Sequence, residues 1–218
     1  MIFKLSDAKL AEQLHAVKIE IARRTRAETA DACRIIKGNE MGKRATLIAA
    51  AGGHSILYIG PPSCGKTMMR AVALELGLAE TFEFHPCPCG FRNDPRRDCT
   101  CTVGKCERHI AKTPVADMYV EICPVPGREL EMKLAGTGID DLKRYLANIG
   151  PELKDKSLCE HSQNIMRASV AELGISAGQR DIILGVAHTI ARLDQSDRIK
   201  TQHLCEAINY RLPNYFKA

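Results

Sequence analysis

The sequence predicts an α/β protein in which a small parallel sheet with helices is followed by an all-α C-terminal region. Three observations support this fold class. An apolar run at residues 56–59 leads through a glycine-rich loop into a helical pattern. Two further short runs, at residues 81–85 and 118–123, have strand character. After Gly127 every periodic segment has helical spacing.

The first part of the chain is expected to be helical. Residues 1–37 form a predicted N-terminal extension, in which Ser6 can cap a helix that runs to about residue 36. A second helix is predicted over residues 43–51, and Gly52-Gly53 is a strong stop signal. The strand at 56–59, its loop and the helix after the loop then follow.

The loop has the sequence Gly60-Pro61-Pro62-Ser63-Cys64-Gly65-Lys66-Thr67, which fits the phosphate-binding pattern G-x-x-x-x-G-K-[ST]. The glycines let successive N–H groups point at one phosphate, and the following helix adds partial positive charge. Lys66 is expected to reach the β- and γ-phosphates, and the Thr67 hydroxyl to ligate Mg²⁺. The predicted nucleotide-binding residues are Gly60, Pro61, Pro62, Ser63, Cys64, Gly65, Lys66, Thr67 and Met68. The alternative is an ordinary Gly/Pro turn that happens to match the pattern.

A Pro/Gly closure at residues 124–127 marks the predicted boundary between a core over residues 38–127 and a helical domain over residues 128–218. In the second domain helices are predicted over the ranges 139–149 and 156–173, and two more begin at expected capping residues, Ser176 and Thr201. Their apolar stripes indicate core packing rather than cofactor contacts.

The length and composition fit a soluble globular protein. The chain has 218 residues, of which 45% are apolar. No apolar run approaches the ~20 residues of a membrane helix, and the first residues lack the pattern of a signal peptide. A cytoplasmic protein with no membrane partner is therefore expected. The net charge of +5 is compatible with nucleic-acid contact but is too small to indicate it alone.

Four cysteines, Cys87, Cys89, Cys99 and Cys101, lie within a Cys-rich insertion over residues 86–109. In a chain without a secretion signal such spacing indicates metal before disulfides. Four thiolates suit tetrahedral Zn²⁺ with no open position, so a structural zinc site is predicted. Cys106, His109 or His85 can substitute for one ligand. The alternatives are unliganded reduced cysteines or a redox role.

Three stretches, in this order, resemble the Mg-chelatase-like AAA+ ATPases, especially the ComM/YifB-like branch. Residues 43–67 (KRATLIAAAGGHSILYIGPPSCGKT) are similar to the family's helix, strand and Walker A segment. Residues 86–101 (PCPCGFRNDPRRDCTC) are similar to its cysteine-rich insertion, and residues 157–211 to its helical lid. The resemblance implies a reduced P-loop AAA+ core that binds ATP or ADP with Mg²⁺, and a homo-oligomer.

The chain also departs from the family pattern. The long family segment that carries the Walker B Asp-Glu has no counterpart between Met68 and Pro86, and Asp140-Asp141 lies in the helical region. His85 stands where the family has its sensor-1 Asn. Gly178 stands at the sensor-2 Arg position, although Arg180 is close. The chain is therefore interpreted as truncated, without the Walker B segment and the amino-terminal domain of its longer relatives.

The resemblance also implies a strand order. Family sheets run 5-1-4-3-2, so loss of strands 2 and 3 leaves the segments 118–123, 55–59 and 81–85 contiguous and parallel. The edge bared at the third of these segments is expected to be covered by the first helix or by a partner chain.

Three functional hypotheses follow. The first is an ATP- or ADP-binding protein that hydrolyses ATP weakly or not at all, because no carboxylate pair is evident. The second is an active oligomeric ATPase motor whose acid comes from Glu83 or from a neighbouring subunit. The third is a nucleic-acid or protein interaction module, with Arg92, Arg96 and Arg97 in contact with DNA phosphates. The full-length relatives suggest DNA branch migration as a hexameric motor, and this activity is not carried over.

Overall fold

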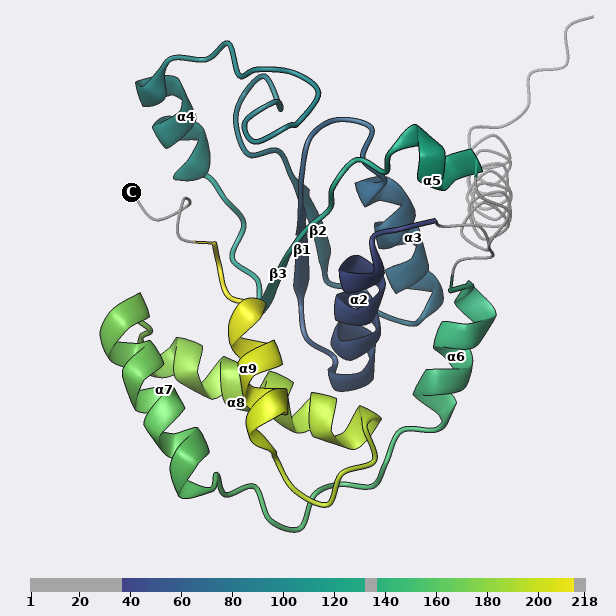
Figure 1. The fold of residues 1–218 in the computed structure, drawn as a ribbon, viewed down its shortest axis with the longest axis vertical. Helices are drawn as coiled ribbons and strands as arrows, with labels where there is room; N and C mark the ends of the chain where they lie inside the picture. The colour runs from purple at the N-terminus through teal and green to yellow at the C-terminus, as the bar shows by residue number, and fades with distance from the viewer. Residues whose placement is uncertain (1–36, 132–136, 214–218) are drawn as a thin grey trace, which may run out of the picture.

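The computed structural model describes residues 37–131 and 137–213 (Figure 1). The helix predicted over residues 6–36 lies outside these ranges. The fold class is confirmed: a three-stranded parallel sheet with helices is joined to a helical C-terminal part. The elements, in chain order, are α2 (Glu40–Gly52), β1 (Ile56–Ile59), α3 (Lys66–Glu75), β2 (Thr81–Phe84), α4 (Val103–Ile110), β3 (Met118–Glu121), α5 (Gly127–Glu131), α6 (Ile139–Ala147), α7 (Glu160–Leu173), α8 (Ala177–Leu193) and α9 (Thr201–Asn209).

The sheet has the strand order β2-β1-β3, as predicted, with β1 in the centre. In the parallel register Tyr58 lies opposite Glu83 on β2 and Val120 on β3. All four residues of β1 are buried, which matches a strand covered on both faces. The carbonyl of Tyr210, after α9, accepts a hydrogen bond from the Tyr119 N–H at 2.7 Å and so protects the outer edge of β3.

The side chains of β1 alternate between two apolar clusters, because successive residues of a strand point to opposite faces. Ile56 and Tyr58 belong to the main core beneath α2 and α3. Leu57 and Ile59 belong to a smaller cluster on the other face, which Ile110 of α4 completes. The Tyr58 hydroxyl, fully buried, lies 2.8 Å from Thr46 Oγ1 on α2. The Pro, Asp, Arg and Gly residues between Gly90 and Lys105 favour a loop over that range, whereas in the structure α4 begins at Val103.

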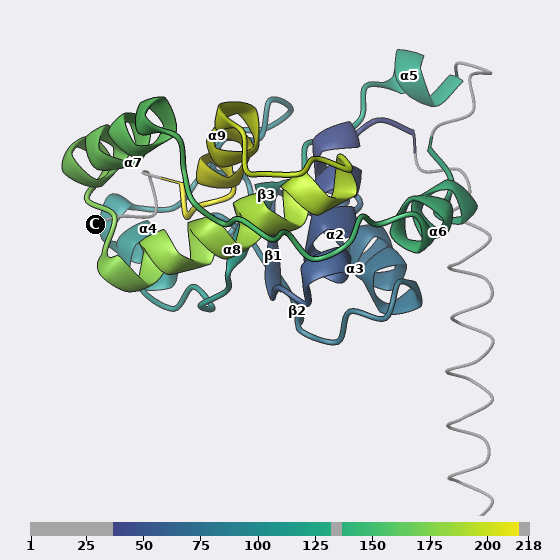
Figure 2. The ribbon, with the colours of Figure 1, turned by 90° about the horizontal axis from the view of Figure 1, so that it is seen from below.

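The C-terminal helices pack directly on α2 and share its core. Figure 2 shows α8 extending from α7 at one side of the molecule to α2 beside the sheet. Arg44 of α2 donates to Asp194 at 2.9 Å and to Glu206 at 3.0 Å, so it joins α2 to the end of α8 and to α9. Ser176 caps α8 by accepting from the Gln179 N–H, as predicted.

Three other predicted features of the C-terminal part differ from the structure. Residues 156–159 are not helical, and α7 begins at Glu160. Lys200, not Thr201, is the residue before the first turn of α9, and the His203 ring accepts the Lys200 N–H at 3.1 Å. The short helix α5 was not predicted, because residues 124–127 were interpreted only as a Pro/Gly boundary between two domains. Among the described helices none has the length and apolar character needed to cross a membrane.

Buried histidines lie where the C-terminal helices meet the rest of the core. His203 is 1% exposed, and His54 Nε2 lies 2.9 Å from Thr189 Oγ1 on α8. Burial lowers the pKa of His54, of His188 and of His203, because a charged imidazolium loses solvation there. Burial therefore disfavours the protonated form of each of these histidines in the folded chain.

Acidification is expected to lower the free energy of unfolding. Unfolded histidines have a pKa of about 6.5, so below that pH the unfolded chain binds protons that the folded chain resists. The decrease in the free energy of unfolding begins near pH 6.5 and continues as the pH falls to the pKa values of the folded-state histidines. Denaturant unfolding at several pH values measures it. His203→Gln should show a smaller pH dependence, and the exposed His161→Gln an unchanged one; equal slopes in all three proteins would contradict this assignment.

Candidate functional site

The phosphate-loop sequence lies at the carboxyl end of β1, between the ends of its two neighbours (Figure 1). The Gly60 N–H donates to the Phe84 carbonyl of β2 at 3.2 Å. A Cβ atom at Gly60 would collide with the Ile122 carbonyl after β3 and would approach Cys64 Sγ at 2.9 Å. Only glycine therefore fits where the chain leaves the sheet, and this fixes the position of the loop.

The backbone of the loop presents N–H groups without protein acceptors. Ser63 has a φ of 58° and Gly65 a φ of 99°, so left-handed residues alternate along the loop, as in anion-binding nests. Among the described residues, the N–H groups of Ser63 and Gly65 donate to no other protein atom, and the Cys64 N–H closes the turn over Pro62 and Ser63. Lys66 then starts α3, which adds the positive end of a helix dipole. The arrangement suits an anion such as a phosphate.

Lys66 carries a buried charge that no carboxylate neutralises within the described part of the chain. Its residue is 5% exposed, and Nζ donates to the carbonyls of Gly60 at 3.0 Å and Pro61 at 2.6 Å. The His85 Nδ1 atom lies 3.5 Å from Nζ and 3.1 Å from the Gly60 oxygen. A buried cation paired only with neutral groups is costly, and an anion in the loop would relieve that cost.

A hydroxyl and a carboxylate lie side by side at the start of α3. Thr67 Oγ1 donates to Glu83 Oε2 at 3.0 Å, and Glu83 also lies 3.8 Å from Arg70. Such oxygen atoms are the ligands that Mg²⁺ prefers. The Asp140-Asp141 pair is elsewhere: both residues belong to α6, where Asp141 accepts the Gly138 N–H and caps the helix.

A cavity of about 280 Å³ opens beside the loop. Both apolar and polar side chains line it, a mixture that is typical of sites for small organic ligands. The residues around it are Lys37, Asn39, Ser63, Cys64, Gly65, Met68, Met69, Arg96, Pro124 and Val125. Arg180, near the predicted sensor-2 position, instead lines a groove between α7 and α8 with Lys156 and Arg167.

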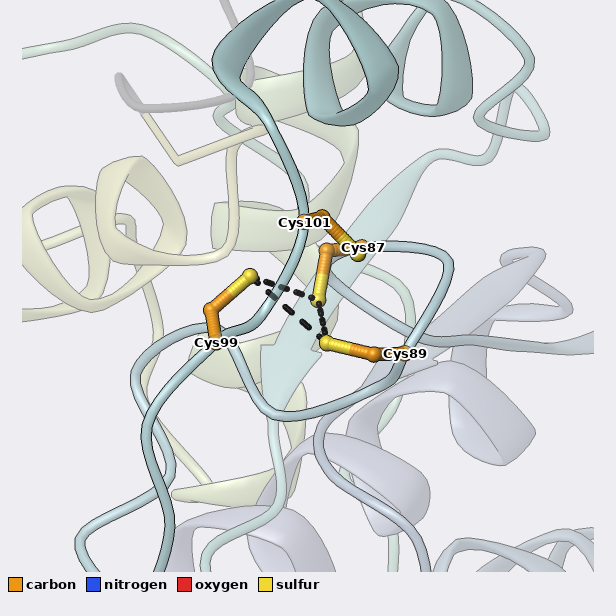
Figure 3. Close-up of side chains that lie close together, drawn as sticks. All are labelled: Cys87, Cys89, Cys99 and Cys101. Carbon is orange, nitrogen blue, oxygen red and sulfur yellow. Dashed lines mark hydrogen bonds between the residues drawn. The ribbon is translucent and has the colours of Figure 1, made fainter.

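The structure brings the four predicted cysteine ligands together (Figure 3). The sulfur atoms of Cys87, Cys89, Cys99 and Cys101 all lie within 4.8 Å of one another. The sulfur of Cys87 is 3.3 Å from that of Cys89 and 3.6 Å from that of Cys99. A tetrahedral site with metal–sulfur bonds of about 2.3 Å has sulfur–sulfur separations of about 3.8 Å, so the cluster can hold a metal with small adjustments.

The thiols of the cluster differ in acidity. Hydrogen bonding, first from the Phe91 N–H, lowers the pKa of Cys89 to about 6. Burial raises the pKa of Cys87 to about 11, and it also raises the pKa of Cys101. One thiol is therefore a thiolate at neutral pH, and metal binding has to displace protons from the others.

The three substitute ligands considered from the sequence take different positions. Cys106 of α4 is buried, with its sulfur 3.9 Å from that of Cys99, so it lies at the border of the cluster. His109 Nε2 bonds the His85 carbonyl at 2.9 Å, and its ring stacks on Phe84. His85 faces the phosphate loop. Neither histidine belongs to the group of potential metal ligands that the four cysteines form among the described residues.

The cysteine loop, defined here as residues 86–102, also contacts the phosphate loop, which the sequence did not reveal. Arg96 Nη2 donates to the Pro62 carbonyl at 3.1 Å, and Gly90 packs against the Pro62 ring. Arg96 had been considered only as a possible DNA contact, in the hypothesis of an interaction module. The third arginine of that hypothesis, Arg97, stacks over the Phe91 ring at 5.3 Å.

Comparisons with known proteins match both ends of the described chain. The family profile described as "Magnesium chelatase, subunit ChlI" matches residues 32–83, and that described as "Magnesium chelatase, subunit ChlI C-terminal" matches residues 149–211. Together they cover just over half of the chain. The first includes the phosphate loop, and the second includes α7, α8 and α9.

Three curated relatives are similar over shorter stretches. The "Uncharacterized protein YifB" of Salmonella typhimurium is 48% identical over 61 residues, which is 28% of this chain and 12% of that protein. YifB of Escherichia coli is 59% identical over 34 residues (16% of this chain, 7% of that protein). The "Competence protein ComM" of Haemophilus influenzae is 53% identical over 36 residues (16% and 7%). The matched stretches thus span a small part of each relative.

Proposed function

Because the chain belongs to the magnesium-chelatase-like family, in the branch of YifB and ComM, we propose that its phosphate loop binds ATP or ADP with Mg²⁺. We also propose that it hydrolyses ATP weakly or not at all. The single observation that carries the first proposal is the buried ammonium of Lys66, which has no anionic partner within the described residues. Phosphate oxygens would supply the missing charge, and the N–H groups of Ser63 and Gly65 would donate to them.

The residues beside the loop support the same ligand. Thr67 and Glu83 would hold Mg²⁺, and the ion, when bound, would bridge phosphate oxygens and offset their charge. The cavity of about 280 Å³ adjoins both the loop and the first turn of α3, and Met68, Met69 and Pro124 give it the apolar walls that suit a nucleoside. Arg96, which pairs with Asp94, also lines this cavity.

Weak hydrolysis is proposed because the metal site has few carboxylates. Attack of water on the γ-phosphate needs a metal ligand and a separate group that orients the water. Among the described residues Glu83 is the acid in contact with Thr67, and it cannot fill both roles at once. The Asp140-Asp141 pair belongs to α6, where Asp141 caps the helix, and no contact of the pair with Thr67 is found among the described residues.

The Thr67–Glu83 contact also supports a second candidate function, an active ATPase that assembles with copies of itself. A neighbouring subunit would then supply the water-orienting acid or a cationic group, while Glu83 remains at the metal. The DNA-binding alternative gains no comparable support, because Arg96 and Arg97 both have partners inside the cysteine loop.

We further propose that the cysteine cluster holds a structural Zn²⁺. Its four sulfurs match an all-thiolate tetrahedral set, and no position is left open for a substrate. The Arg92 N–H donates to the Cys87 sulfur at 3.2 Å, a contact that orients the thiolate and stabilises its charge.

Equilibrium binding of labelled ATP and ADP, with and without Mg²⁺, is expected to show specific binding that Lys66→Ala weakens about 10- to 100-fold, the effect of losing a charge-assisted contact. The exposed Lys154→Ala is the matched control and should bind normally. A hydrolysis assay on the same samples should show little turnover. Absence of binding in the unaltered chain would refute the nucleotide proposal; turnover at the rate of ordinary AAA+ enzymes, lost in Lys66→Ala, would refute weak hydrolysis.

Glu83→Gln separates the two candidate functions. If the chain only binds nucleotide, this variant should lose most of the Mg²⁺-dependent gain in affinity, roughly tenfold, because an amide is a weaker ligand for a hard cation. If the chain is an oligomeric ATPase, hydrolysis should rise with protein concentration and disappear in Glu83→Gln. The exposed neighbour Glu80→Gln is the control. Unchanged Mg²⁺ dependence in Glu83→Gln would rule out a metal role for this carboxylate.

Elemental analysis of the purified chain is expected to find about one zinc ion per molecule. Cys89→Ser should lose the metal during gel filtration, since three thiolates and a hydroxyl bind zinc much more weakly. Cys205→Ser, at an exposed cysteine of α9 outside the cluster, should keep it. Equal zinc contents in the two variants, or none in the unaltered chain, would contradict a zinc site at these cysteines.

A further inference from the structure

The cysteine loop touches one residue of the phosphate loop, Pro62, from two sides. The Gly90 turn has a φ of +83°, and a Cβ atom there would lie 2.7 Å from Pro62 Cδ, so glycine permits the closest approach. On the other side Arg96 Nη2 donates to the Pro62 carbonyl at 3.1 Å. The ring and the carbonyl of Pro62 are therefore both held by the same neighbouring loop.

Arg96 is held firmly in this position. Its Nε and Nη2 atoms donate to the two carboxylate oxygens of Asp94, each at 3.0 Å, and its backbone N–H donates to the same carboxylate at 2.9 Å. The Asp94 side chain is fully buried, and the bidentate pair fixes the plane of the guanidinium. The hydrogen bond from Arg96 lowers the pKa of Asp94, so the pair is ionised at neutral pH.

Both contacts belong to the segment that a metal at the cysteine cluster would close. Gly90 follows Cys89 directly, and Asp94 and Arg96 lie between Cys89 and Cys99. The segment has no helix or strand of its own. The sulfur contacts of the cluster are therefore the main cross-link between its two ends.

Fixing Pro62 has a consequence for the phosphate site. In a trans peptide the C=O and the following N–H point in opposite directions. The bond from Arg96 to the Pro62 carbonyl therefore directs the Ser63 N–H away from the cysteine loop. It also helps to hold Ser63 at its φ of 58°, a conformation that is unfavourable for a residue other than glycine. The anion-binding shape of the loop depends on this peptide plane.

We propose that metal at the cysteine cluster and nucleotide at the phosphate loop bind with positive coupling, with Arg96 as the positioning residue between the two sites. The proposal rests on nucleotide binding at residues 60–67, which is itself proposed above. Metal orders the cysteine loop, the ordered loop holds Pro62, and the held peptide presents its N–H to phosphate. Coupling is reciprocal, so nucleotide must raise the affinity for zinc by the same factor.

The experiment measures ADP affinity of the full chain when zinc-loaded, when stripped by a chelator selective for zinc over magnesium, and when reloaded. Stripping should weaken ADP binding about five- to tenfold, within the usual range of coupling between sites, and reloading should restore it. In the converse titration ADP should tighten zinc binding by the same factor. ADP affinity that is equal with and without zinc would overturn the coupling and leave the nucleotide proposal standing. No ADP binding in the zinc-loaded chain would overturn both.

Variants at Arg96 separate coupling from a loss of folding. Arg96→Gln keeps all four cysteines, so it should retain zinc yet bind ADP about as weakly as the stripped chain. Arg96→Lys keeps the charge without the planar fork and should recover part of the affinity. Arg97→Gln makes the same charge change in the same loop without a phosphate-loop contact, and it should bind ADP normally. If Arg96→Gln still loses five- to tenfold in ADP affinity when zinc is removed, Arg96 does not carry the coupling. This outcome is decisive even if zinc removal unfolds the cysteine loop.

Discussion

The carbonyl groups of Gly60, Pro61 and Pro62 all accept hydrogen bonds from cations, and the shape of the phosphate loop depends on this interaction. Lys66 holds the first two from inside the loop, and Arg96 holds the third from outside. Pro61 and Pro62 have no N–H, so the two carbonyls that Lys66 holds belong to peptides without a donor. The Pro62–Ser63 peptide does have one, and its N–H points away from the carbonyl that Arg96 holds. Lys66 adds a positive charge that no carboxylate neutralises among the described residues, so its side chain and the Ser63 N–H favour the same kind of ligand.

The strand beside β1 carries an acid next to the phosphate loop. Because β2 pairs directly with β1, Glu83 lies opposite Tyr58 and within reach of the first turn of α3. The chain thus has a carboxylate beside Thr67 although the family's Walker B segment has no counterpart between Met68 and Pro86. One carboxylate can hold a metal, but it leaves the second requirement of hydrolysis to another group. The position of Glu83 on β2 therefore bears directly on the chemistry.

Local sequence patterns predicted much of this structure, and contacts between distant segments explain the rest. The motif at residues 60–67, the short strands and the order β2-β1-β3 follow from spacing and from the family resemblance. Helix α4 was not predicted from the sequence, because its start is polar and its stability comes from burying Cys106 and Ile110. The bond from Arg96 to Pro62 joins residues 34 positions apart, and no local pattern indicates such a contact. The four-cysteine spacing, by contrast, predicted a cluster whose sulfurs do lie together.

The close succession of β2, the cysteines and the phosphate-loop contacts explains why metal and nucleotide should affect each other. Only His85 and Pro86 separate the end of β2 from Cys87, so the cluster begins almost at the sheet. The cysteine loop has too few apolar residues to fold by burial, and metal ligation can supply the ordering energy instead. Any ordering of this loop fixes Gly90 and Arg96 against Pro62. A metal site described as purely structural would therefore also influence the affinity of the neighbouring phosphate loop for nucleotide.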